Sequence, residues 1–61
     1  MDKKEFLDIL RSQLSGQMSE QQIAAHIQYY SSDIEERTAA GNSESEVLRE
    51  LGDPRLIART L

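Results

Sequence analysis

Four helix-breaking residues constrain this 61-residue chain more than any other feature. Gly16, Gly41, Gly52 and Pro54 divide it into segments, and close to each lies a serine or an aspartate that can cap the next helix. The segments carry apolar residues at helical spacing, and none alternates as a strand does. The sequence therefore predicts an all-α fold, a compact bundle of four short helices over about residues 3–15, 20–40, 44–51 and 54–61.

The predicted helix starts carry capping signals. Three pairs have the spacing of a capping box, in which each residue bonds the backbone N–H of the other: Asp2 with Glu5, Ser19 with Gln22, and Ser43 with Glu46. Between the last two helices, Gly52 supplies a positive φ, Asp53 an N-cap, and Pro54 a first helical residue that loses no hydrogen bond. These two helices are therefore expected to be separate.

One small core is expected to hold the four apolar stripes together. Its predicted members are Phe6, Leu7, Leu10, Leu14, Met18, Ile23, Ile27, Tyr30, Ile34, Val47, Leu48, Leu51, Leu56, Ile57, Ala58 and Leu61. With no cysteine to supply disulfides, so short a chain is expected to be marginally stable by itself. The last helix reaches Leu61 without a closing residue, so we expect residues 1–61 to be a single helical domain, the amino-terminal part of a longer protein.

The residue inventory argues against catalysis and cofactor binding. Nucleophilic catalysis needs a nucleophile, a base and an orienting group, and the chain has one imidazole, His26, and no cysteine. A calcium loop over 33–44 fails because Thr38 stands where the loop needs glycine and Arg37 occupies a ligand position. The glycines are solitary, which excludes a phosphate-binding loop. We therefore expect no catalytic, metal or cofactor site.

Charge argues against a direct nucleic-acid ligand. The chain carries 11 acidic and 7 basic side chains, a formal net charge of −4. The last two predicted helices could form a helix-turn-helix, with Arg55 and Arg59 on the second, but the acids beside them would repel phosphates. No stretch is apolar enough for a membrane span or a signal peptide, so the segment is expected to be cytoplasmic and not itself inserted in a membrane.

One flank of the helix predicted over 20–40 is the best candidate for a contact surface. Tyr30 faces the predicted core, so its neighbour Tyr29 is not part of the core pattern. The Tyr29 ring is expected either to lie against the rim of another helix or to be exposed for a partner. His26 and Asp33 lie on the same flank, beside an acidic stretch that ends at Glu36. The candidate partner-binding residues are therefore His26, Tyr29, Asp33 and Glu36.

Several short motifs together resemble the bacterial HAAS signalling domain family. They are Lys4-Glu5-Phe6-Leu7, Tyr29-Tyr30 followed by Asp33, Gly41, Ser43-Glu44, Glu46-Val47, Leu51-Gly52-Asp53-Pro54 and Ile57-Ala58. The resemblance implies an all-helical cytosolic module without catalytic residues, usually amino-terminal to a membrane-spanning region and often encoded beside a PadR-like winged-helix regulator. Ser31-Ser32 and Ile34 depart from the family pattern, in which an aromatic or acidic residue more often follows the tyrosine pair.

Three classes of function remain open. The first is a cytosolic signalling or protein-interaction module of a membrane protein, linked to a PadR-like regulator. The second is a free-standing acidic adaptor that binds a basic partner by mimicking nucleic-acid charge. The third is a small homo-oligomerisation module, because small cores often gain stability by symmetric association.

Overall fold

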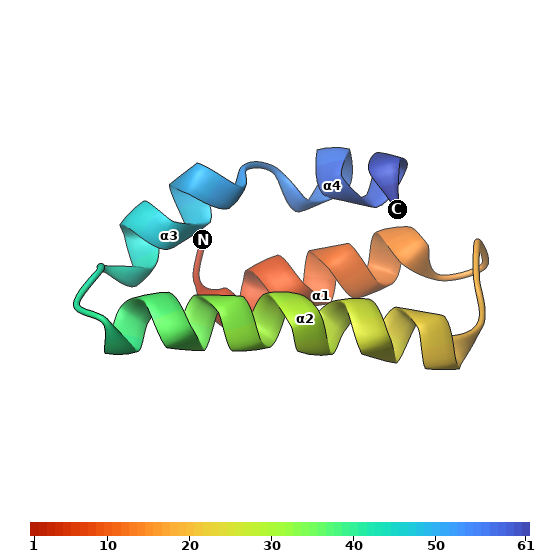
Figure 1. Ribbon diagram of the computed structural model, residues 1–61. Coiled ribbons are helices and arrows are strands. Elements are labelled where there is room, and N and C mark those ends of the chain that lie inside the picture. The colour runs from red at the N-terminus through yellow and green to blue at the C-terminus, as the bar shows by residue number, and fades with distance from the viewer.

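The computed structural model describes residues 1–61 as four α-helices without a strand (Figure 1). The helices are α1 (Lys3–Leu14), α2 (Glu20–Ala39), α3 (Glu44–Leu51) and α4 (Pro54–Thr60). The molecule measures 35 × 18 × 17 Å, and α2 runs along its length. The all-α prediction is confirmed. Three predicted helices end one residue earlier than expected, because Ser15, Ala40 and Leu61 are caps.

Each helix begins at the position that its capping residue predicted. The side chains of Asp2, Ser19 and Ser43 accept hydrogen bonds from the backbone N–H three residues on, at 2.8, 3.1 and 3.1 Å. Only Gln22 returns the bond, by accepting from the Ser19 N–H at 3.0 Å. The reciprocal bonds predicted for Glu5 and Glu46 are not made, so α2 alone begins with a complete capping box.

Glycines at positive φ end the first three helices. After α2, the Gly41 N–H donates to the Thr38 carbonyl and the Asn42 N–H to the Arg37 carbonyl, both at 3.1 Å, which is a Schellman motif. At the other turn, Gly52 has φ +89°, and the Asp53 side chain caps α4 by accepting from the Arg55 N–H at 2.9 Å. The predicted separation of α3 and α4 is therefore confirmed.

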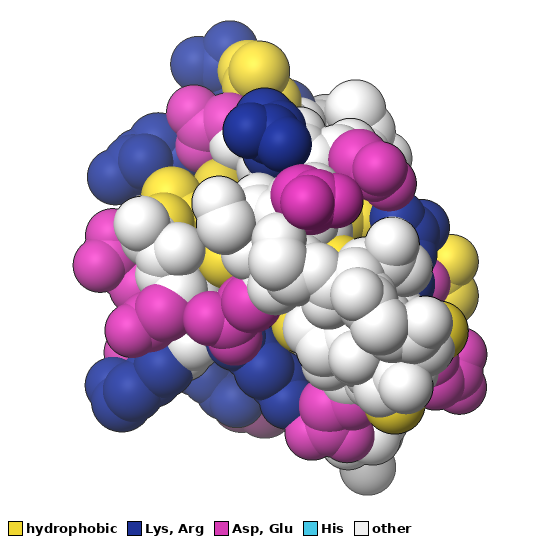
Figure 2. Space-filling view, turned by 90° about the vertical axis from the view of Figure 1, so that its left-hand side faces the viewer, with side chains coloured by type: hydrophobic (Ala, Val, Ile, Leu, Met, Phe, Trp, Pro, Cys, Tyr) yellow, Lys and Arg dark blue, Asp and Glu magenta, His cyan; other side chains and the backbone are white.

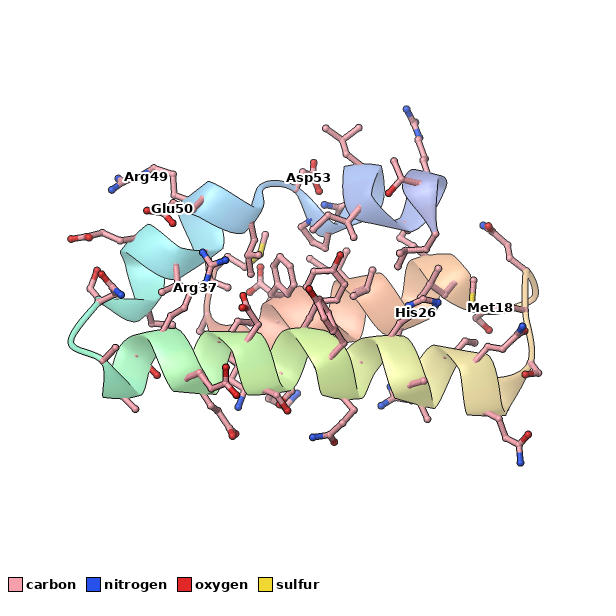
Figure 3. All side chains as sticks on the ribbon, viewed as in Figure 1. Met18, His26, Arg37, Arg49, Glu50 and Asp53 are labelled. Atoms are coloured by element: carbon pink, nitrogen blue, oxygen red, sulfur yellow. The ribbon has the colours of Figure 1, made fainter.

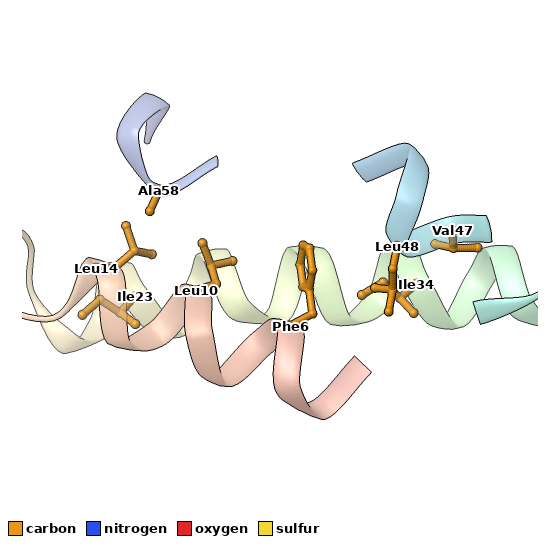
Figure 4. Packing of buried hydrophobic residues seen from close by; sticks show 8 residues of the cluster. All are labelled: Phe6, Leu10, Leu14, Ile23, Ile34, Val47, Leu48 and Ala58. Carbon is orange, nitrogen blue, oxygen red and sulfur yellow. The ribbon is translucent and has the colours of Figure 1, made fainter. Parts of the chain in front are cut away.

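The core lies along α1. This helix contacts α2, α4 and, less extensively, α3, and α2 also contacts α3 (Figure 1). The side chains of Phe6, Leu10 and Leu14 are fully buried along α1. Around them lie the other buried apolar residues, Ile23, Ile34, Val47, Leu48 and Ala58 (Figure 4).

Three details of the core differ from the predictions. Leu56 and Leu61 were expected inside but are 56% and 40% exposed. The reason is that α4 turns Pro54 and Ala58 toward α1, and Leu56 lies about 200° around the helix from both. Pro54 is itself fully buried, although from the sequence it was expected only to start the helix.

The middle of α2 is only partly covered. Ile23 and Ile34 are buried, but Ile27 and Tyr30, at the same helical spacing, stay half-buried. The physical reason is that α3 covers only the carboxyl-terminal part of α2, and α4 rests on α1 instead. No helix of the structure combines the length and the apolar character of a membrane-spanning segment.

Candidate functional site

Tyr29 stands at the surface end of a row of aromatic rings. The buried Phe6 ring lies 6.3 Å from Tyr30, and Tyr30 lies 5.1 Å from Tyr29 with the two rings nearly perpendicular. Tyr29 is 66% exposed, and its aromatic contact is with its own chain neighbour and not with another helix. The ring is therefore held in an edge-to-face contact while most of its surface faces solvent.

A shallow hollow surrounds this ring on the side of α2 that points away from α1. Six residues line it: Ala25, Gln28, Tyr29, Ser32, Asp33 and Glu36. We call these six residues the outer face of α2. Three of the four predicted contact residues, Tyr29, Asp33 and Glu36, thus lie together, whereas His26 does not line the hollow. The His26 side chain is half-buried on the side of α2 that faces α1 and α4 (Figure 3).

Arg37 holds two carboxylates of different helices. Its Nε lies 3.1 Å from Asp33 Oδ2, one turn earlier on α2, and its Nη1 lies 3.1 Å from Glu50 Oε2 on α3 (Figure 3). Asp33 Oδ2 is buried and makes no aligned hydrogen bond, so the Arg37 charge is what compensates its burial. The charge of Asp33 is therefore balanced within the domain.

Of the acids on the outer face, Glu36 alone has no ion pair. Its neighbour Glu35 is paired with Lys3 of α1, a second tie between helices. The acidic stretch at 33–36 is thus less negative than its sequence suggests. An incoming partner meets one free carboxylate, a phenol and uncharged polar groups.

Burial raises the pKa of the Tyr30 hydroxyl above its ordinary value of 10.0, and the nearby Tyr29 and Asp33 raise it further. All three causes disfavour a phenolate at this position. Tyr30 is therefore a neutral ring at physiological pH, and it supports Tyr29 by packing instead of by charge.

A second hollow lies at the turn between α3 and α4. It is lined by Met1, Ser45, Leu48, Arg49, Gly52, Asp53 and Arg55. Its two arginines are exposed, and the Arg55 guanidinium lies 3.7 Å from the Asp53 carboxylate. This mixture of charges at an open turn favours no one class of ligand.

Unpaired basic residues are scattered and form no stripe. Arg11, Arg49 and Arg59 have no ion pair, and they lie on α1, α3 and α4 respectively. Seen from the end of the molecule that carries the α2–α3 turn, acidic and basic side chains are interspersed around uncharged groups (Figure 2). Such a surface lacks the continuous positive field that tracks a phosphate backbone.

Comparison with known families matches residues 5–60 to HAAS, which is nearly the whole chain. The chain belongs to the HAAS family. The resemblance seen in the sequence is thereby confirmed, and membership of HAAS supports a signalling or interaction module in general. No curated protein and no solved structure matches the chain significantly.

Sequence reasoning found only part of this HAAS surface. It selected the residues of one flank, and it did not include Ala25, Gln28 and Ser32, which complete the hollow. Helical spacing could have identified these three residues, because it places them on the side of α2 opposite Ile23 and Ile34. The bridge from Arg37 to Asp33 was also visible as a pair one turn apart, but its extension to Glu50 depends on the packing of α3.

Proposed function

We propose that this HAAS domain is a non-catalytic signalling module that works by binding another protein chain through the outer face of α2. The observation that carries the proposal is Tyr29, a large aromatic ring two-thirds exposed on a rigid, fully capped helix. Aromatic residues with a polar tip are enriched at protein interfaces and supply much of the binding energy there. The immediate surroundings favour a polar, hydrogen-bonding partner over a purely apolar one.

The cellular setting is part of the same proposal. The family resemblance supports a cytoplasmic domain that precedes a membrane-spanning region and is linked to a PadR-like transcription regulator. A regulator bound or released by this domain would carry a signal from the membrane to transcription. The full reading frame tests the setting: a membrane span after residue 61 supports it, and a stop codon there contradicts it.

A free-standing acidic adaptor has less support. A charge mimic of nucleic acid presents free carboxylates in a row. In this domain Asp33, Glu35 and Glu50 are each held by a basic residue of the same chain, which reduces the field along α2. The proposal likewise assigns no nucleic-acid ligand, no metal and no cofactor to the domain.

Calorimetric titration of the domain with the PadR-like regulator encoded beside it tests the proposed contact. Tyr29→Ala is expected to weaken binding by about 1–3 kcal/mol, as loss of an interface aromatic does, while the variant stays folded. Leu56→Ala is the matched control, because Leu56 is a similarly exposed apolar residue on α4. A large loss of stability without a binding defect in Tyr29→Ala, or a binding defect in Leu56→Ala alone, would contradict the proposal.

A further inference from the structure

We propose that Glu36 determines which partners the outer face of α2 accepts, by binding a basic side chain, an arginine or a lysine, of the protein that docks there. This inference rests on the proposed function, because it uses the same surface, and it adds the chemistry of the partner. Its basis is the part that each carboxylate of the chain plays inside the domain.

Six of the 11 acidic side chains stabilise the start of a helix. Two of them are N-caps, Asp2 and Asp53. The other four lie in the first turn of a helix, where the positive end of the helix dipole favours a negative charge: Glu5, Glu20, Glu44 and Glu46. These six charges are therefore explained by the fold itself.

Four further carboxylates are paired with a basic residue of the same chain. They are Asp8, Asp33, Glu35 and Glu50. Glu36 alone remains, because it neither lies at a helix start nor forms an ion pair. It is thus the one negative charge of the chain that no part of the domain favours.

The position of Glu36 is unfavourable for a carboxylate. It lies in the last turn of α2, where the negative end of the helix dipole opposes it. Asp33, one turn earlier on the same hollow, adds a second negative charge. Arg37, the next residue, is engaged by Asp33 and Glu50. An exposed carboxylate that the domain itself does not favour points to a counter-charge supplied by another chain.

Glu36 and Tyr29 can be reached by the same partner. They are seven residues apart, which places them about two turns along α2 and within about 20° of the same helical angle. A protein that covers the Tyr29 ring can therefore also contact the Glu36 carboxylate. An ionised carboxylate only accepts hydrogen bonds, so the partner group is a donor. A positively charged donor also offsets the repulsion from Asp33, and arginine can bind a carboxylate through two parallel N–H bonds.

Glu36→Gln tests the assignment, because it removes the charge and keeps nearly the same shape and an accepting oxygen. We expect the melting temperature to rise by about 1–4 °C, since an unfavourable charge leaves the helix end. Calorimetric titration with the PadR-like regulator encoded beside the domain is expected to show affinity lowered about fivefold or more. Stability and binding thus change in opposite directions, whereas loss of a merely structural residue would lower stability alone.

Glu20→Gln is the matched control. Glu20 is also exposed and unpaired on α2, but it lies in the first turn and outside the hollow. Its loss is expected to lower the melting temperature slightly and to leave the affinity unchanged. Glu36→Lys reverses the charge and is expected to weaken binding about tenfold or more while the domain stays folded. Rising salt should weaken binding of the original domain more than binding of Glu36→Gln.

Three results would overturn the assignment: a Glu36→Gln variant that binds as the original does, an equal loss of affinity in Glu20→Gln, or equal salt dependence of Glu36→Gln and the original. The last would indicate an uncharged donor on the partner. The proposed function fails separately. A regulator whose binding depends on Tyr29 and not on Glu36 overturns the basic side chain alone. A regulator that does not bind the domain overturns both.

Discussion

Replacing Arg37 with methionine removes the charge that ties α2 to α3 and keeps a long apolar stem at the same place. The two ion pairs of Arg37, one with Asp33 and one with Glu50, contribute unequally to the stability of the fold. The Glu50 side chain is 70% exposed, so its arm contributes at most about a few tenths of a kcal/mol. The Asp33 side chain is 27% exposed, and the variant leaves its buried Oδ2 without a partner, which costs about 1–3 kcal/mol.

We therefore expect Arg37→Met to lower the free energy of unfolding by about 1–3 kcal/mol. At roughly 4–8 °C per kcal/mol for a domain of this size, the melting temperature falls by about 5–20 °C. Thermal and urea unfolding, followed by circular dichroism, measure both quantities. Arg49→Met is the matched control, because Arg49 has no ion pair, and it is expected to change stability by less than about 0.5 kcal/mol.

A double-mutant cycle isolates the Asp33 arm. Asp33→Asn removes the carboxylate charge, so Arg37→Met in that background is expected to cost clearly less than it does in the original chain. Equal costs in the two backgrounds, or an Arg37→Met variant as stable as Arg49→Met, would show that Arg37 does not compensate the buried carboxylate.

Two further predictions concern the backbone and pH. Gly52→Val forces a β-branched residue to φ +89°, at a place where its side chain would meet no other atom. Backbone strain alone should therefore lower the free energy of unfolding by about 1–3 kcal/mol. An unchanged melting temperature would contradict the left-handed conformation of residue 52. Because the pKa of Tyr30 is raised on folding, its contribution to stability is complete below its ordinary pKa of 10.0 and is lost as pH rises through the folded value. Denaturant titrations above pH 10 should therefore show a smaller loss of stability for Tyr30→Phe than for the original chain, and equal losses would contradict this assignment.

Local signals determined the helices, and for this reason the sequence located them well. Asp2, Ser19, Ser43 and Asp53 cap through bonds to the next two or three residues, and the glycines end helices through their own φ. None of these interactions depends on distant parts of the chain. The second bond of a capping box is harder to predict: Gln22 makes it and Glu5 and Glu46 do not, although all three side chains are exposed.

Tertiary packing determines which sides of α4 and α2 are buried, and this could not be predicted from the sequence. A seven-residue helix has too few turns to show which side faces the core, so Leu56 was placed inside and Pro54 was overlooked. His26 was grouped with Tyr29 by helical angle, but its side chain is half-buried and does not line the hollow. The outer face itself followed from the period of α2 once the covered side was known.

Whether the outer face of α2 is a protein-binding surface can be observed residue by residue in solution. The decisive experiment is an amide NMR titration of the isotope-labelled domain with a PadR-like regulator encoded beside it. We expect shifts or line broadening confined to Ala25, Gln28, Tyr29, Ser32 and their neighbours on that face, with α4 unchanged. Spectra that the regulator leaves unchanged, or shifts centred on Leu56 and the α3–α4 turn, would contradict a contact through this face.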